Sequence, residues 1–192
     1  MRNVYLEGKR IYLRPLDKEQ DANLACQWIN TEEMRQFIGH GAFPTSLEAE
    51  KAWFDEKPEK FPQRVRLAIV LKKNDRLIGS IAISDINWVD RSAGTGTLVG
   101  QKQDRGRGYG TEAKELLLRY AFQTLGLNRV ESKVLAYNQA SLRYAEKCGY
   151  RREGILRQAI YKNGQYHDLI IHSVLREEWL ARQKKSNKKT KR

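Results

Sequence analysis

The sequence predicts a single α/β domain, in which one mixed sheet carries helices on its faces. Three observations support this prediction. The 192 residues are enough for one domain with a sizeable core and marginal for two. Segments of alternating apolar residues, typical of strands, are interleaved with segments of helical periodicity. The sequence also lacks internal repeats, proline-rich linkers and composition shifts that would mark a domain boundary.

The first elements are one strand and two helices. Residues 10–16 alternate between apolar and polar side chains, which is typical of a strand. Residues 17–30 have helical spacing, with Asp17 placed to cap the N-terminus of the helix. A second helix is predicted to open at Thr45, because Glu48 follows three positions later and the two could form a capping box.

The middle of the chain is predicted to hold three strands and the longest helical stripe. Residues 65–84 are two strands around a Lys-Asn-Asp turn, and residues 94–101 are the next strand. Apolar residues then recur at helical spacing through residues 113–125, and Gly126 is expected to end that helix.

The last elements complete an alternation of strands and helices. Residues 129–136 form a strand, and a short helix capped by Asn138 follows. Residues 154–175 form a hairpin around Asn163-Gly164, which is the strongest short hairpin signal in the chain. The predicted order is β-α-α-β-β-β-α-β-α-β-β.

The composition is that of an ordinary globular protein with an excess of positive charge. Hydrophobic residues make up 40% and charged residues 31%. No apolar run approaches the roughly 18 residues that a membrane span needs, and the chain start lacks the pattern of an export signal. We therefore expect no membrane partner. Cys26 and Cys148 form no C-x-x-C pair, so we expect a cytoplasmic protein without disulfides. The net charge of +13 favours an anionic ligand over a polycationic one.

The stretch RGRGYGTEA, residues 105–113, places three glycines at alternate positions directly before a helix. Such a turn is typical of an anion site, because its N–H groups and the helix N-terminus both attract negative charge. Arg105 and Arg107 add positive charge beside it. The spacing matches neither a P-loop nor a dinucleotide-binding fingerprint. A flexible turn without a ligand is the alternative that the glycines alone leave open.

Arg105, Gly108 and Gly110 match the Q/R-x-x-G-x-G/A signature of the GNAT superfamily of N-acetyltransferases. Residues 105–179 resemble the RimJ/RimL branch of ribosomal-protein N-acetyltransferases, and LEGKRIYLRPL and WINTEEM resemble its N-terminal half. The resemblance implies an α/β GNAT-type domain with a mixed, mostly antiparallel sheet. It also implies that this sheet splays between its fourth and fifth strands and has helices on both faces.

The same resemblance sets the expected boundaries and activity. The GNAT-type domain should span residues 1–179, and residues 180–192 should be a basic, disordered tail. The implied enzyme is an acyltransferase that moves an acetyl group from acetyl-CoA to a primary amine by direct attack, without a covalent enzyme intermediate. Its acetyl-CoA would be held by the glycine turn, by the edge of the fourth strand and by one short helix. The expected acetyl-CoA-binding residues are Leu98, Val99, Gly100, Arg105, Gly106, Arg107, Gly108, Tyr109, Gly110, Thr111, Asn138 and Ser141.

Ser141 is the expected catalytic residue. Many relatives protonate the leaving thiolate with a tyrosine seven residues after the asparagine that matches Asn138, but Ala145 occupies that position here. In the RimJ/RimL branch a serine three residues after the asparagine is the proposed substitute, and Ser141 matches it. Two roles stay open for Ser141, an acid and a small spacer beside the ligand. Asn138 could likewise serve as a helix cap in addition to binding the pantetheine arm.

No residue of the sequence stands out as the general base. The fourth strand lacks the glutamate that relatives often place there, and Asp85, Asp90 and Glu33 are each better explained as solvated or structural carboxylates. An α-amine with a pKa of about 8 is roughly a tenth neutral at pH 7, whereas a lysine amine is neutral about once in 2,500 molecules. A protein N-terminal α-amine of the ribosomal-protein type is therefore the favoured acceptor.

Alternatives to that substrate and to catalysis itself remain open. The acceptor could be a small-molecule amine such as an amino sugar, an antibiotic or a polyamine, or the protein could bind acetyl-CoA or RNA without catalysis. The basic residues 184–192 could hold RNA or ribosomes weakly.

His40, His167 and His172 show no metal-ligand spacing, so no metal is expected. Asp168 is interpreted as structural. Monomer and homodimer are both compatible with the sequence.

Overall fold

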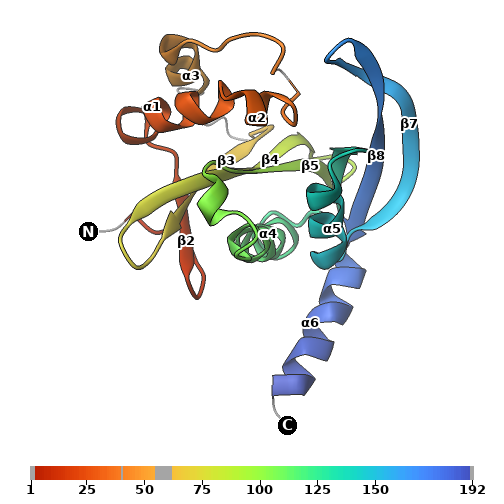
Figure 1. Cartoon of the computed structure of the whole chain (residues 1–192). Coiled ribbons are helices and arrows are strands. Elements are labelled where there is room, and N and C mark those ends of the chain that lie inside the picture. Colours follow the sequence, from red (N-terminus) through yellow and green to blue (C-terminus); the bar gives the residue numbers. More distant parts are fainter. Residues whose placement is uncertain (1–2, 40, 55–61, 191–192) are drawn as a thin grey trace. The chain divides into compact units, whose positions relative to one another are not determined.

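The computed structural model describes residues 3–39, 41–54 and 62–190, with the side chains of all but residues 186–190 of these (Figure 1). The strands are β1 (Leu6–Glu7), β2 (Ile11–Pro15), β3 (Val65–Leu71), β4 (Arg76–Asn87), β5 (Ser92–Val99), β6 (Arg129–Leu135), β7 (Arg151–Lys162) and β8 (Gln165–Leu175). The helices are α1 (Lys18–Ile29), α2 (Glu32–Arg35), α3 (Leu47–Phe54), the 3-10 helix η1 (Lys102–Asp104), α4 (Tyr109–Arg119), its π-helical end η2 (Tyr120–Thr124), α5 (Gln139–Lys147) and α6 (Arg176–Thr190).

The strands form one mixed sheet in the order β1-β2-β3-β4-β5-β6-β8-β7. β5 and β6 are parallel, and the other registered pairs are antiparallel. Because the two-residue β1 was not predicted, the fourth and fifth predicted strands are β5 and β6. Their register ends at Gly94 and Glu131, so the second half of β5 has no registered partner on β6. The predicted mixed sheet and its splay are confirmed.

Contacts divide the chain into two compact units. The first contains residues 1–82 and 96–116, and the second contains residues 83–95 and 117–192. Strands β4 and β5 and helix α4 each run from one unit into the other.

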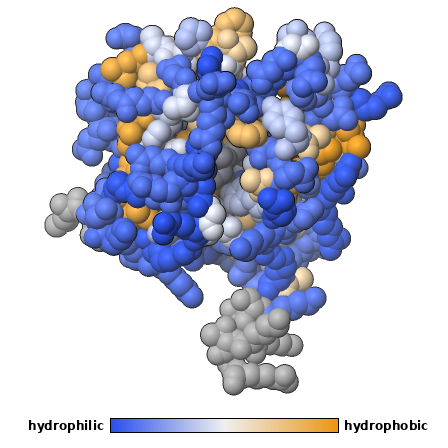
Figure 2. Space-filling model, viewed as in Figure 1, coloured by the Kyte–Doolittle hydropathy of each residue, from blue (hydrophilic) through white to orange (hydrophobic). Residues whose placement is uncertain are grey.

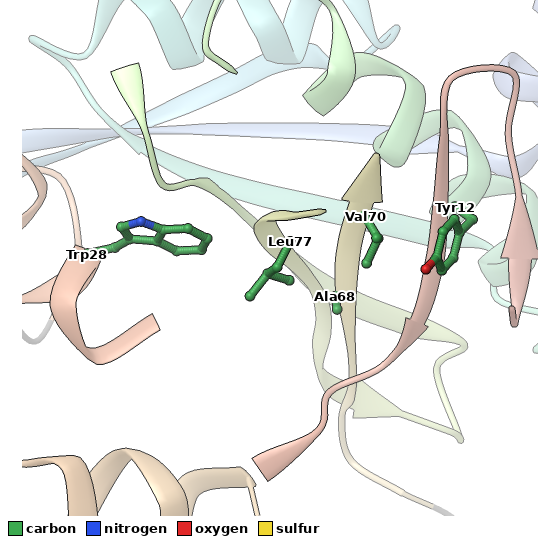
Figure 3. Close-up of a cluster of buried hydrophobic side chains, with 5 residues drawn as sticks. All are labelled: Tyr12, Trp28, Ala68, Val70 and Leu77. Atoms are coloured by element: carbon green, nitrogen blue, oxygen red, sulfur yellow. The ribbon is translucent and has the colours of Figure 1, made fainter. Parts of the chain in front are cut away.

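The core of the first unit lies between the sheet and the N-terminal helices. It consists of Tyr12, Trp28, Ala68, Val70 and Leu77, contributed by α1 and by strands β2 to β4 (Figure 3). Helices α1 and α3 lie on this side of the strands, and α4 begins on the other side (Figure 1). β3 is apolar along nearly its whole length because both of its faces are covered.

The second unit is organised around the β7–β8 hairpin and the last two helices. The hairpin turns at Asn163 and Gly164, which have φ values of 51° and 81° as a type I′ turn requires. On the helical side, the rings of Phe122 and Trp179 pack with their centroids 5.7 Å apart.

The C-terminal segment differs from its prediction. Residues 180–190 continue helix α6, whereas the sequence predicted a disordered tail from residue 180. The helix is anchored by buried Trp179 and by Arg182, which donates hydrogen bonds to the carbonyls of Lys147 and Cys148. Lysine, arginine and glutamine favour helices, so an anchored helix can extend through this basic run. The described helices include none that is long and apolar enough to cross a membrane.

The predicted helix caps are partly correct. Asp17 caps α1 by accepting hydrogen bonds from the N–H groups of Glu19 and Gln20, as expected. The capping box at Thr45 is wrong, because Ser46 Oγ accepts the hydrogen bond from the N–H of Ala49 at the start of α3. Serine and threonine are comparable caps, so the sequence could not rank these neighbours.

The stability of the second unit is expected to depend on Glu153 and on pH. Arg129 donates hydrogen bonds of 2.8 and 2.5 Å to the two oxygens of Glu153, and Ser173 Oγ donates one of 2.5 Å. These bonds, the Arg129 pair first, lower the pKa of Glu153 from 4.5 to about 2. A lowered pKa in the folded state adds stability above the unfolded pKa of about 4.3, and this is lost as the pH falls towards 2.

Glu153→Gln should therefore cost about 1 kcal/mol at pH 7, a value reduced for the partial exposure of the pair. The difference from the parent should vanish near pH 2. Urea denaturation at several pH values measures it, with Glu177→Gln as a control on an exposed glutamate. A Glu153→Gln penalty of the same size at every pH would show that the carboxylate charge is not involved.

Candidate functional site

The glycine turn between η1 and α4 depends on backbone conformations that favour glycine. Gly106 and Gly108 have φ values of 72° and 82°, in the left-handed region that side chains disfavour. The Gly108 carbonyl accepts a hydrogen bond from Glu112 N–H at 3.0 Å, so Gly108 caps α4. Gly110 lies within the first turn of α4. The first N–H groups of a helix lack partners within it and point outward, which is the arrangement that a phosphate needs.

Arg10 holds this turn against β2. Its Nε and backbone N–H donate to the two oxygens of Glu112 at 2.9 and 2.8 Å, and its Nη1 donates to the Arg107 carbonyl at 2.9 Å. The pKa of Glu112 is raised by burial but lowered on balance by these hydrogen bonds. Pairing with Arg10 offsets the negative charge that Glu112 places in the first turn of α4. No local sequence signal marks Arg10 for this role, because its partners lie about a hundred residues away along the chain.

A second ion pair holds the segment that leads into the turn. Asp104, at the end of η1, is only 4% exposed. Arg76 on β4 donates to its two oxygens at 2.8 and 2.7 Å. This pairing, through its hydrogen bond first, raises the pKa of Arg76. The turn is thus held on one side by Arg76 and on the other by Arg10.

Arg105 has a different role from the one that its charge suggested. Its Nε donates to the Val99 carbonyl at 3.0 Å, and Nη2 donates to the Gly100 carbonyl at 2.6 Å. Its Nη1 pairs with Glu33 of α2 at 2.5 Å. The guanidinium therefore joins the end of β5 to α2, and only its backbone belongs to the glycine turn. Arg107 donates from Nε to the Gln103 carbonyl at 2.6 Å.

The end of β5 exposes only part of the expected backbone edge. The Gly100 N–H donates to the Ile78 carbonyl of β4 at 2.9 Å. Backbone groups alternate along a strand, so those of Leu98 and Gly100 face β4 and those of Val99 face the opposite, splayed edge. A Cβ on Gly100 would lie 2.1 Å from the Trp28 ring, which explains the glycine there. Because the Val99 carbonyl accepts a hydrogen bond from Arg105 Nε, the Val99 N–H is the group here that can pair with an added strand-like ligand.

In the second unit, Asn138 and Ser141 open helix α5. Asn138 Oδ1 accepts a hydrogen bond from Ser141 N–H at 3.1 Å, so the predicted cap is present. Within the described part of the chain, Asn138 Nδ2 has no hydrogen-bond partner. Ser141 is half-buried, and Ala145 on the same helical face is only 4% exposed. Tyr144 lies about 100° around the helix from Ala145, so it does not take over the position of the family tyrosine.

The carboxylates that the sequence offered as bases all have structural contacts. Glu33 pairs with Arg105. Asp85 accepts a hydrogen bond from Ser84 Oγ, and Asp90 accepts one from Asn87 Nδ2 at 2.7 Å. These contacts agree with the interpretation of these carboxylates as structural.

A GNAT acetyltransferase domain model matches residues 10–151. The chain belongs to the GNAT acetyltransferase family. As a GNAT N-acetyltransferase it is an enzyme, and its mixed sheet with a parallel β5–β6 pair is the GNAT fold.

Three relatives illustrate the range of proteins that this GNAT chain is similar to. YjcK of Bacillus subtilis, named a probable N-acetyltransferase, is 33% identical over 178 residues, covering 88% of this chain and 96% of YjcK. YdaF of Bacillus subtilis, provisionally named a ribosomal N-acetyltransferase, is 29% identical, covering 87% and 90%. The structure of spermidine N-acetyltransferase from Vibrio cholerae, in complex with CoA and spermine, has a TM-score of 0.81 at 21% identity, covering 89% and 98%.

Arg105→Ala is expected to weaken acetyl-CoA binding about tenfold, with little dependence on salt. The substitution removes charge-assisted hydrogen bonds that position β5, each of which contributes about 1.5–3 kcal/mol. Calorimetric titrations with acetyl-CoA in low and high salt measure the effect. Arg107→Ala is the matched control, because loss of an exposed charge should matter less as salt rises. A strongly salt-dependent Arg105→Ala effect would instead support a role as a free charge.

Proposed function

We propose that this enzyme transfers the acetyl group of acetyl-CoA to the α-amine of a protein N-terminus, as in the RimJ/RimL branch. The observation that carries the donor assignment is the glycine turn at the start of α4, with its two left-handed glycines. The GNAT neighbour that binds CoA supports the same donor.

The residues around the turn fit a pyrophosphate and a pantetheine arm. The N–H groups from Gly106 to Thr111 would bind the phosphates, because a cradle of N–H groups at a helix N-terminus favours anions. At the splayed edge, the Val99 N–H would donate to a carbonyl of the pantetheine arm, as a strand edge does to an added strand, while the Val99 carbonyl stays bonded to Arg105. In the second unit, Asn138 Nδ2 would donate a hydrogen bond to an amide carbonyl of acetyl-CoA.

When bound, acetyl-CoA supplies a thioester whose carbonyl carbon accepts a neutral amine and whose thiolate then leaves. The chain's part is to bind and orient both partners and to supply a proton to the thiolate. We infer that Ser141 Oγ donates that proton and takes up the proton that the attacking amine loses, so that the hydroxyl is restored. The half-buried position of Ser141 beside the cap residue Asn138 supports this role.

The class of acceptor amine is inferred from the contacts of the candidate general bases and from the net charge of the chain. The base candidates named from the sequence are engaged in other contacts, which favours an amine that is already partly neutral at pH 7. The net charge of +13 disfavours polycationic spermidine and spermine. The similarity to YdaF supports a ribosomal substrate.

The basic end of the chain supports a location near the ribosome. Residues 182–192 carry seven lysines and arginines and no acidic residue. We infer a cytoplasmic enzyme in which these charges attract RNA, to which the protein would bind weakly and in a salt-dependent manner.

A panel of acceptors tests the proposal. Thiol release from acetyl-CoA should be measured with peptides that carry the N-termini of ribosomal proteins, with amino sugars and with spermidine. We expect the highest kcat/KM for a peptide with a free N-terminus and no turnover for the same peptide with a blocked N-terminus. Preferred turnover of an amino sugar or spermidine would establish a small-molecule enzyme, and no turnover of any amine would refute catalysis.

A further inference from the structure

We propose that a pocket at the bulge of β7 is an acceptor subsite, which selects a primary amine that also carries a carbonyl or carboxylate oxygen. The inference rests on the proposed function and adds the chemistry by which the acceptor is recognised. The pocket has a volume of about 440 Å³ and is lined by Arg157, Gln158 and Asp168. This volume is within the usual range for small-ligand sites.

The pocket lies where β7 departs from regular pairing with β8. The register shifts between Leu156 and Ile160, and within this bulge Gln158 has a left-handed φ of 50°. Gln158 N–H donates to Asp168 Oδ1 at 2.8 Å, which holds the bulge in place. Bulges and left-handed non-glycine residues are frequent at functional sites, where they re-aim side chains.

Two charged groups of the pocket retain capacity for a ligand. Among the residues that the structure describes, Arg157 has no ion pair and Asp168 Oδ2 has no hydrogen-bond partner. A carboxylate oxygen binds an ammonium group, and a guanidinium donates to carbonyl or carboxylate oxygens. A peptide N-terminus carries both kinds of group. A polyamine carries only cations, which Arg157 would repel.

The pocket adjoins the turn that carries Asn138. The Ala136 N–H donates to the Asp168 carbonyl at 3.0 Å. Tyr137, in the turn after β6, and His167, next to Asp168 on β8, have their rings edge-on with centroids 4.7 Å apart. Asp168 therefore lies on the same end of β6 and β8 as Asn138, where the pantetheine arm is proposed to bind.

Binding can be measured without turnover by titrating isotope-labelled protein and following its backbone NMR signals. The probes are the tripeptide Ser-Ala-Ala, its N-acetylated form and 1,4-diaminobutane. The free tripeptide should shift the signals of Arg157 and Gln158, and the other two probes should bind at least about tenfold more weakly. Unshifted signals, or equal binding of the three probes, would overturn the assignment of the pocket.

Substitutions of Asp168 and Arg157 distinguish the effect of their charges on acceptor binding from an effect on the structure of the bulge. Asp168→Asn keeps an oxygen that can accept the Gln158 N–H but removes the negative charge. It should raise the KM for the tripeptide at least about tenfold, with kcat and acetyl-CoA affinity unchanged. Arg157→Gln should reduce the preference for the tripeptide over 1,4-diaminobutane. Lys73→Gln, on the exposed β3–β4 turn, is the control for loss of a surface charge.

The outcomes distinguish this inference from the proposed function. An active enzyme whose tripeptide KM is the same in Asp168→Asn and in the parent would refute the pocket and leave acetylation intact. A parent protein that acetylates no amine would refute the proposed function, and the NMR titration would still decide whether the pocket binds the tripeptide.

Discussion

Gly108→Val should weaken acetyl-CoA binding at least about a hundredfold, which is about 2.7 kcal/mol. Gly108 has a φ of 82°, which a β-branched residue adopts only under strain. A Cβ would also lie 3.2 Å from a guanidinium nitrogen of Arg10, the residue that holds the turn against β2. The bulky side chain would both occupy the space of the pyrophosphate and reorient the N–H groups that bind it.

The binding loss must be separated from a loss of stability. Gly164→Val is a matched control, because Gly164 has nearly the same φ of 81° but lies in the β7–β8 turn. A Cβ on Gly164 would meet no described atom within 4 Å. Thermal melts should show destabilisation in both variants, whereas calorimetric titration should show weak acetyl-CoA binding only in Gly108→Val. A folded Gly108→Val protein with the parent's affinity would falsify the phosphate cradle.

Ser141→Ala should lower kcat about a hundredfold and leave the affinity for acetyl-CoA unchanged. Positioned general acids contribute about 10²- to 10⁴-fold, and loss of an interaction made only in the transition state lowers kcat and kcat/KM together. The backbone N–H of Ser141 would still donate to Asn138, so the start of α5 should persist. Steady-state kinetics with a reactive acceptor, together with acetyl-CoA titration, measures both quantities.

Ser141→Cys is the control for this assignment. The thiol keeps a proton donor at nearly the same position, so it should retain more activity than Ser141→Ala. If Ser141→Ala has the kcat of the parent, Ser141 is a small spacer beside the ligand and water protonates the thiolate.

Several features were predictable because they depend on local chemistry. Positive φ favours glycine and asparagine, so Asn163-Gly164 marked the hairpin and Gly108 marked the special turn before α4. Asp17 and Asn138 accept hydrogen bonds from N–H groups two or three residues away, so their capping roles could be inferred from sequence spacing. The GNAT signature rests on the same local turn, and for this reason the family was recognisable from the sequence.

Other features depend on residues that are distant along the chain. The partners of Arg10 and Arg76 lie on α4 and η1, and the partner of Arg105 lies on α2. Which arginines hold the glycine turn and which remain available to an anion could not be inferred from charge and spacing alone. The continuation of α6 likewise depends on contacts of Arg182 with the end of α5.

The family, the position of the turn and the order of the longer strands and helices up to residue 175 could be inferred from the sequence, because glycine conformations, caps and periodicity act within a few residues. The short elements β1 and α2 and the helix α6 were not predicted. That Val99, and not Leu98 or Gly100, faces the splayed edge could be known only from the folded chain, since this depends on the register between β4 and β5. The same holds for the bulge that brings Arg157 and Asp168 together. Such pairings depend on how strands align across the sheet, and side-chain spacing along one strand does not specify that alignment.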